Sequence, residues 1–202
     1  APPGWEKKEL PFLITLAQEG VPVAIEDTRE PDGNKLRAKT FLVPHAVKRT
    51  AGMKSNLLWD DPEYALALDI KGSPDKAAAK HALFIQRIEE EKLSDIPDIA
   101  TLMAFLKRPD KHALLSTLSP ESFEQLKQAS FLSFRIAGRS EPIFRNPDVI
   151  TRLTSSTNET GEETSFCMVS GATDSMARLH PPVQGVRGAN TTGGNIVAFN
   201  AA

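Results

Sequence analysis

Short runs of alternating apolar and polar positions occupy the first 70 residues, and a period of two is the pattern of half-buried β-strands. Runs over 12–16 and 21–25 flank a turn-like segment at 18–20, which predicts a hairpin. The run over 36–43 alternates basic and apolar residues, so we expect a strand with one positive, solvated face. A further strand is predicted over 64–70.

The middle of the chain has a helical period instead. Ser73-Pro74 and Ser119-Pro120 each place a capping side chain before a proline, which suits the first helical turn because that turn needs no N–H donor. A third helix is expected to begin near Ser94 and to stop before Pro109. Apolar residues at helical spacing predict the inward face of each helix. These are Ala78, Ala82, Ile85 and Ile88 in the helix after Ser73, Ile99, Leu102, Met103 and Leu106 in the helix from Ser94, and Phe123 and Leu126 in the helix after Ser119.

The remaining segments complete the predicted fold. Residues 1–10 are expected to form a loop, and 131–136 a strand that returns to the sheet. A short helix is expected from Asn146-Pro147 to Leu153, and the polar stretch 154–164 predicts a surface loop. The fold class is therefore α+β, a largely antiparallel sheet with a helical insertion around 73–128.

Composition adds the broad class of the protein. Apolar residues make up 40% of the 202 and charged residues 25%, which is typical of a soluble globular domain. No run of 18 apolar residues occurs, so no membrane partner is predicted. The single cysteine, Cys167, excludes an internal disulfide and fits the reducing cytoplasm. We expect the chain to be a part of a longer protein.

Charge is segregated along the chain although the net charge is only −2. Residues 33–59 hold no acid and six basic residues, whereas 60–124 hold 13 acids and 8 bases. After Asp174 no acid follows, and Arg178 and Arg187 are the only formal charges. This distribution permits a polyanionic partner that the net charge alone would not suggest.

A glycine-rich stretch over 185–195 is hard to explain as core. It lacks the Gly-Lys-Ser/Thr ending of a phosphate loop, and a strand pattern at 196–200 follows it instead of a helix. Short neutral donors stand beside its glycines, namely Asn190, Thr191, Thr192 and Asn195. Such a loop can touch a sugar–phosphate backbone through main-chain N–H groups. A hairpin loop without a ligand remains the alternative.

The acid-free window contains two clusters, Lys48-Arg49-Thr50 and Lys54-Ser55-Asn56. Charged groups position a protein on phosphates, while short neutral side chains suit base edges. The alternative is an ordinary solvated strand face. Trp59 could stack on a base, but the neighbouring Leu57 and Leu58 favour a core position.

Enzymatic chemistry finds little support. No G-x-S-x-G elbow surrounds a serine, and Cys167 lies in an apolar run, where a buried inert thiol is expected. The histidines do not cluster at metal-ligand spacing, and Glu89-Glu90-Glu91 is most simply a solvated helix face. No catalytic residue, metal or cofactor is predicted, and a cryptic nuclease is the weakest of the hypotheses.

Two separated segments resemble one known family. They are V-K-R-T-A-G-M-K-S-N-L-L-W-D-D-P-E-Y at 47–64, and C-M-V-S-G at 167–171 followed by A-R-L-H-P-P-V-Q-G-V-R-G-A-N-T-T-G-G-N-I-V-A-F-N at 177–200. Both are similar to segments in the large subunit of the type I-C CRISPR interference complex (Cascade). The similarity spans roughly 4–201, so residues 1–202 would form the N-terminal, PAM-sensing domain of a larger subunit.

The resemblance implies a non-catalytic, DNA-binding subunit. It would inspect the short motif flanking the target (the PAM) in double-stranded DNA and help to part the strands, while guide RNA reads the sequence. Other Cascade subunits and a recruited helicase-nuclease would be its protein partners. The candidate DNA-binding residues are Lys48, Arg49, Thr50, Lys54, Ser55 and Asn56, with Gln184, Arg187, Asn190, Thr191, Thr192, Gly193, Gly194 and Asn195. A protein-docking module that assembles the complex or recruits the nuclease remains the alternative.

Overall fold

The computed structural model describes residues 2–50, 52–159, 164–166 and 173–175. The chain divides into two compact units, Ala1–Leu153 and Thr154–Ala202. The strands are β1 (Trp5–Glu9), β2 (Phe12–Ala17), β3 (Val21–Asp27), β4 (Arg29–Asp32), β5 (Lys35–Ala38), β6 (Thr40–Pro44), β7 (Trp59–Asp60), β8 (Leu132–Ile136), β9 (Thr164–Phe166) and β10 (Thr173–Ser175). The helices are α1 (Pro62–Leu66), α2 (Pro74–Glu90), α3 (Pro97–Leu106), α4 (Lys111–Leu118), α5 (Pro120–Lys127) and α6 (Pro147–Glu159), with 3₁₀ turns η1 (Gln18–Gly20) and η2 (Ile143–Arg145).

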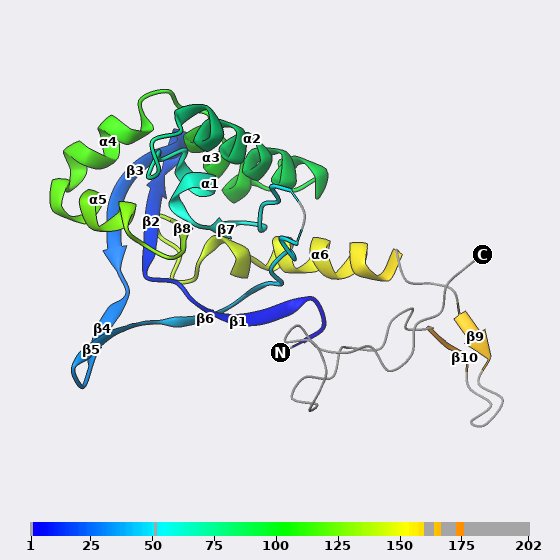
Figure 1. The fold of residues 1–202 in the computed structure, drawn as a ribbon. Coiled ribbons are helices and arrows are strands. Elements are labelled where there is room, and N and C mark those ends of the chain that lie inside the picture. Colours follow the sequence, from blue (N-terminus) through cyan, green and yellow to red (C-terminus); the bar gives the residue numbers. More distant parts are fainter. Residues whose placement is uncertain (1, 51, 160–163, 167–172, 176–202) are drawn as a thin grey trace. The chain divides into compact units, whose positions relative to one another are not determined.

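A four-stranded sheet in the order β3-β2-β8-β7 forms the centre of the first unit. Strand β2 pairs antiparallel with β3, which confirms the predicted hairpin, and parallel with β8. Helices α1 to α5 lie together beside this sheet, and hairpin β4–β5 extends away from them (Figure 1). The α+β class and the predominance of antiparallel pairing agree with the sequence. In the second unit, β9 and β10 pair antiparallel.

The core of the first unit is built from aromatic side chains contributed by both layers. Phe134 of β8 packs against Phe84 of α2 and Phe105 of α3, with ring centroids 6.4 and 5.9 Å apart. All three side chains are fully buried. Aromatic pairs at this separation add to the free energy that burial itself provides. Packing between α2, α3 and β8 therefore fixes the helical insertion to the sheet.

Strand β1 corrects the expected loop over 1–10. It pairs antiparallel with β6, and the two strands form a ribbon of their own. Its sequence, Trp-Glu-Lys-Lys-Glu, has no apolar alternation, and none of its residues is buried. Backbone hydrogen bonds to a distant partner, rather than a buried face, make this segment a strand, and a local pattern cannot reveal them.

Helix α1 corrects the strand expected over 64–70. The Asp61 carboxylate accepts from the backbone N–H groups of Glu63 and Tyr64 at 3.0 and 3.2 Å, and Pro62 occupies the first turn. Every residue of this short helix is buried. Since no face is exposed, the apolar spacing carries no information on the period.

The helical insertion partly confirms the predicted faces. All four inward residues of α3 are buried, as are Phe123 and Leu126 of α5. On α2 the prediction is half right: Ile88 is buried and Ile85 packs against the core, whereas Ala78 and Ala82 are exposed. The polar residues Lys80 and His81 are buried instead. The unexpected helix α4 follows α3, and α6 continues through Glu159, where a loop was expected from 154 onward.

Gly20 holds α3 close to the sheet. Its φ is +70°, in the left-handed region, and a Cβ atom there would lie 2.3 Å from the backbone nitrogen of Phe105. Only glycine fits both the backbone conformation and the close approach.

Candidate nucleic-acid interface

The segment 45–58 joins β6 to β7 and carries one of the two groups of candidate residues; we call it the basic loop. Its ends are drawn together by Trp59, whose indole N–H donates to the carbonyl of Pro44 at 2.9 Å. Trp59 is fully buried, so the expected core position is confirmed. The loop therefore begins and ends on the packed part of the first unit.

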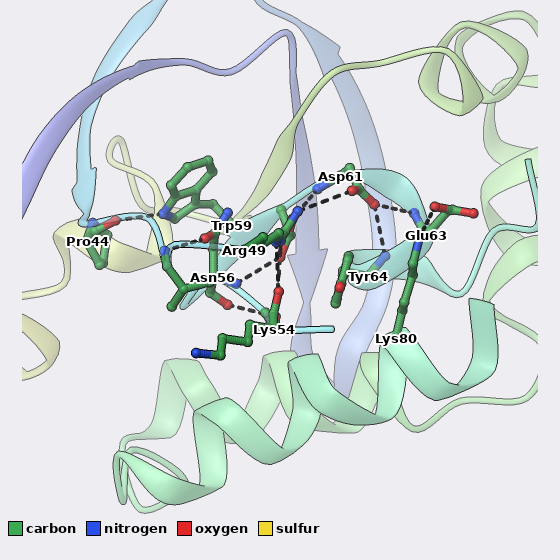
Figure 2. A network of polar contacts seen from close by, with 12 residues as sticks. Pro44, Arg49, Lys54, Asn56, Trp59, Asp61, Glu63, Tyr64 and Lys80 are labelled. Carbon is green, nitrogen blue, oxygen red and sulfur yellow. Dashed lines mark hydrogen bonds and ion pairs between the residues drawn. The ribbon is translucent and has the colours of Figure 1, made fainter. Parts of the chain in front are cut away.

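The buried carboxylate of Asp60 accepts hydrogen bonds from several residues of the basic loop. Asp60 is 0% exposed, and Arg49 donates to both of its oxygens at 2.6 Å. The backbone N–H groups of Asn56 and Asp61 donate to the same carboxylate at 2.9 and 2.8 Å, and the Ser55 hydroxyl donates at 3.3 Å. Figure 2 shows Arg49 joined to this network, and its side chain is 31% exposed. The carboxylate thus connects several points along one loop.

Further bonds close the loop on itself. The Asn56 side-chain oxygen accepts from the backbone N–H of Val47 at 3.0 Å, and Arg49 Nε donates to the carbonyl of Lys54 at 2.8 Å. Ser55 and Asn56 are 5% and 3% exposed. Of the six predicted residues in this segment, Arg49, Ser55 and Asn56 are therefore engaged in shaping the loop.

The other three predicted residues face solvent. Lys48, Thr50 and Lys54 are exposed, and within the described residues no hydrogen bond or ion pair engages their side chains. The side chain of Lys54 extends away from the network in Figure 2. Two positive charges without an acidic partner among the described residues thus stand on a loop whose Arg49, Ser55 and Asn56 side chains are engaged internally.

The pKa shifts and ion pairs beneath the loop agree with this division into inward-facing and solvent-facing side chains. Burial raises the pKa of Asp60, and the hydrogen bond from Arg49 is the largest opposing effect. The Tyr64 ring lies 4.4 Å from the Arg49 guanidinium and 5.3 Å from the Lys80 ammonium, and burial raises the pKa of Tyr64. Lys80 in turn forms a buried ion pair with Glu63. The inward cations are thus balanced by acids, and only the outward lysines remain for an external anion.

A cavity of about 320 Å³ lies between the basic loop and α2. The loop and the helix contribute equal numbers of lining residues, and Met53 is 42% exposed there. The lining is formed by Val47, Met53, Lys54 and Ser55 with Leu83, Gln86, Arg87 and Glu90. The loop is therefore anchored at Asp60 but stands free of solid packing along part of α2.

The second group of candidate residues lies outside the described residues. It comprises Gln184, Arg187, Asn190, Thr191, Thr192, Gly193, Gly194 and Asn195, and Cys167 and His180 lie outside as well. The structure therefore brings together the residues of the basic loop and does not bear on the glycine-rich stretch.

Two histidines of the helical layer, the buried His81 and the half-buried His112, contact backbone carbonyl groups within the fold. The two ring nitrogens of His81 face the carbonyl oxygens of Tyr64 and Leu106 at 2.8 and 2.9 Å. His112 Nε2 faces the carbonyl of Leu66 at 2.5 Å. In the ranges that the structure describes, no three His, Cys, Asp or Glu side chains are grouped as metal ligands. The same ranges hold no helix with the length and apolarity that a bilayer crossing requires.

Sequence reasoning missed Asp60, the residue on which the loop depends. An acid after Leu57-Leu58-Trp59 reads as the solvated end of an apolar run. The neighbouring Asp61-Pro62 did carry a readable signal, since an aspartate before a proline is a helix start. The residues around Asp60 do not indicate that Arg49 supplies the cation that allows this carboxylate to be buried.

Comparison with family models shows to which protein family the chain belongs. The model described as CRISPR-associated protein (Cas_Csd1) matches residues 1–202. The chain belongs to the Cas_Csd1 family. This membership gives the chain a CRISPR-related role in defence and makes it a Cascade-type component of a multi-subunit complex. Among curated proteins, no match to this Cas_Csd1 chain is found.

Proposed function

We propose that this Cas_Csd1 chain is a non-catalytic, DNA-binding part of the large subunit of a type I-C Cascade. It recognises the PAM in duplex DNA and helps to separate the strands, so that guide RNA can pair with its target. Family membership supports the complex, and the basic loop supports the DNA contact.

The proposed setting follows from the same family. The chain would form the N-terminal domain of the subunit, with helices α2 to α5 as its insertion, and would work in the cytoplasm beside guide RNA and the other Cascade subunits. A helicase-nuclease recruited to the complex would carry out cleavage. The long acid-free window beside an acidic insertion supports a surface with one face for nucleic acid.

One observation carries the proposal: Lys48 and Lys54 stand exposed and unpaired on a loop whose other charges are neutralised internally. Lysine binds phosphate as a point charge and needs no fixed geometry. Two such lysines within seven residues of chain suit neighbouring phosphates of a duplex backbone.

The remaining candidates take different roles in this proposal. Thr50 is exposed beside Lys48, and its hydroxyl can donate to or accept from a base edge or a phosphate. Gln184, Arg187 and the stretch 190–195 form the second DNA-facing element, with main-chain N–H groups as donors. Arg49, Ser55 and Asn56 influence recognition through the shape of the loop, since each already forms a side-chain hydrogen bond within it or to Asp60 beneath it.

The test uses the assembled complex and duplex targets with the matching and with permuted PAMs. Lys48→Ala and Lys54→Ala should each weaken binding several-fold on every target and reduce the slope of log K against log salt by about 1. Lys76→Ala is the matched control, because Lys76 is an exposed lysine two turns along α2 from the cavity residue Leu83. The proposal fails if the two loop variants bind like this control.

A second candidate function, protein docking, has its own observation. Hairpin β4–β5 extends from the unit, and Leu36 is 61% exposed opposite Pro31 on the partner strand (Figure 1). An exposed apolar pair at the end of an arm suits contact with a neighbouring subunit. Leu36→Ser should then impair assembly of the complex while DNA binding of the assembled fraction stays unchanged. The two functions use different surfaces and can coexist.

A further inference from the structure

We propose that Asp60 and Arg49 are positioning residues, which fix the basic loop so that Lys48 and Lys54 reach DNA, and that Arg49 itself makes no DNA contact. The inference rests on the proposed function and assigns a role to each residue of the loop. The sequence instead groups Arg49 with Lys48 as a phosphate contact.

Two of the three guanidinium nitrogens of Arg49, Nε and Nη2, already donate hydrogen bonds within the fold. Nη2 donates to both oxygens of Asp60, Nε donates to the carbonyl of Lys54, and Nη1 lies 3.7 Å from Asp61 Oδ2. The guanidinium also lies 4.4 Å from the Tyr64 ring. To meet a phosphate through Nε or Nη2, the side chain would have to leave these hydrogen bonds. It would also leave a fully buried carboxylate without its cation, which is strongly unfavourable.

The network anchors the chain on both sides of Lys48, and at Lys54 and the residue that follows it. Lys48 lies between Val47, which donates to Asn56, and Arg49, which is held by Asp60. Lys54 accepts from Arg49 through its own carbonyl, and the next residue, Ser55, donates to Asp60. The backbone positions of both lysines are thereby set before any ligand arrives, while their side chains remain free. Preorganisation of this kind increases affinity because less ordering remains to be done on binding.

If Arg49 were itself a DNA contact, substitution of Asp60 would change DNA affinity in the opposite direction. If Arg49 contacted phosphate and Asp60 only competed for it, then Asp60→Asn would remove a competing anion and binding would become stronger. If Asp60 positions the loop, the same change loosens the loop and binding becomes weaker. A nearly isosteric substitution therefore separates the two roles by the direction of the effect.

The experiment measures duplex binding by the assembled complex with Asp60→Asn, in the parent chain and in a Lys48→Ala/Lys54→Ala background. In the parent chain we expect a loss of about tenfold, comparable to one lost charge-assisted hydrogen bond. In the double-alanine background we expect almost no further loss, because Asp60 acts through those two lysines. Stronger binding by Asp60→Asn, or an equal loss in both backgrounds, would overturn the inference.

Two further measurements keep the test decisive. If Asp60→Asn does not assemble, Asn56→Ala replaces it, because this change removes only the neutral bond to Val47 and should also weaken binding in the parent chain alone. Hydrogen exchange of the amides of 45–58 should be faster in either variant, and unchanged exchange would contradict the anchoring. If Lys48→Ala/Lys54→Ala binds DNA normally, the proposed function fails, while the exchange measurement still tests the anchor separately.

Discussion

The acid-free window 33–59 is one charge feature in the sequence but two different structures in the molecule. In hairpin β4–β5, Arg37 pairs with Glu9 and Asp32 at 3.2 and 3.7 Å, and its side chain is 66% exposed. In the basic loop, Arg49 pairs at 2.6 Å with a carboxylate that solvent does not reach. Both partners of the first pair are exposed to water, whereas in the second pair the carboxylate is fully buried and the Arg49 side chain is 31% exposed.

The difference shows that the position of a cation does not reveal its function. Exposed ion pairs contribute little to stability, because solvent and salt screen them and two long side chains must be ordered. A buried pair contributes little net energy as well, but breaking it by removing one partner is costly. Arg49, which the sequence groups with the candidate DNA contacts, is therefore a residue whose loss from the buried pair is costly to the fold.

The largest expected effect is on stability. Arg49→Ala should lower the free energy of unfolding by about 3 kcal/mol, because Asp60 would remain buried without its cation. Arg37→Ala should lower it by about 0.5 kcal/mol, since that pair is exposed. Urea denaturation of the two variants measures both values. Equal losses would show that the buried pair has no special role.

Removing both partners sharpens the same comparison. Arg49→Met with Asp60→Asn should recover about 1–2 kcal/mol relative to the sum of the single losses, because the cost lies mainly in the orphaned charge. Arg37→Met with Glu9→Gln should instead be additive within about 0.5 kcal/mol, because neither partner is desolvated. A double-mutant cycle in each region provides the comparison. Additivity at Arg49 and Asp60 would indicate that they do not act as a unit.

Sequence reasoning succeeded where burial follows from local pattern. The hairpin of β2 and β3 and the inward faces of α3 and α5 depend on apolar residues at regular spacing, and a single segment carries that signal. It was only partly right on α2, where Ile88 is buried as expected but Lys80 and His81 also face inward, because Glu63 and the carbonyls of Tyr64 and Leu106 are their partners. Polar residues can be buried only when distant partners satisfy them, and the chain order does not disclose these partners.

The candidate site shows the same limit. Its exposed lysines could be identified from the acid-free window, but the carboxylate that orders them stands just outside that window, at Asp60. Asp60 is 11 residues from Arg49 in sequence. Only the folded chain reveals that this acid lies beneath the loop, and so the positioning role could not be predicted.

Salt provides a smaller test of the comparison. At 1 M salt the Debye length falls to about 3 Å, so the effect of Arg37→Ala should nearly vanish. The effect of Arg49→Ala should persist, because solvent ions do not enter the site of Asp60. Urea denaturation at low and high ionic strength distinguishes the two cases. A parallel decrease in both effects would mean that the loop pair is screened like a surface pair.

The smallest expected effect is an opposite dependence on pH. The hydrogen bond from Arg29 lowers the pKa of Asp27, at the base of hairpin β4–β5, so this carboxylate contributes stability above the unfolded value of 3.8 and loses it as the pH falls through the folded value. Burial raises the pKa of Asp60, so the folded state takes up this proton more readily than the unfolded chain does. The destabilisation caused by Asp27→Asn should therefore shrink from pH 6 to pH 3, by only a few tenths of a kcal/mol because that pair is partly solvated. The destabilisation caused by Asp60→Asn should instead grow over the same interval. Denaturation series of the two variants against the parent chain measure both slopes, and slopes of the same sign would remove the distinction between the buried and the exposed carboxylate.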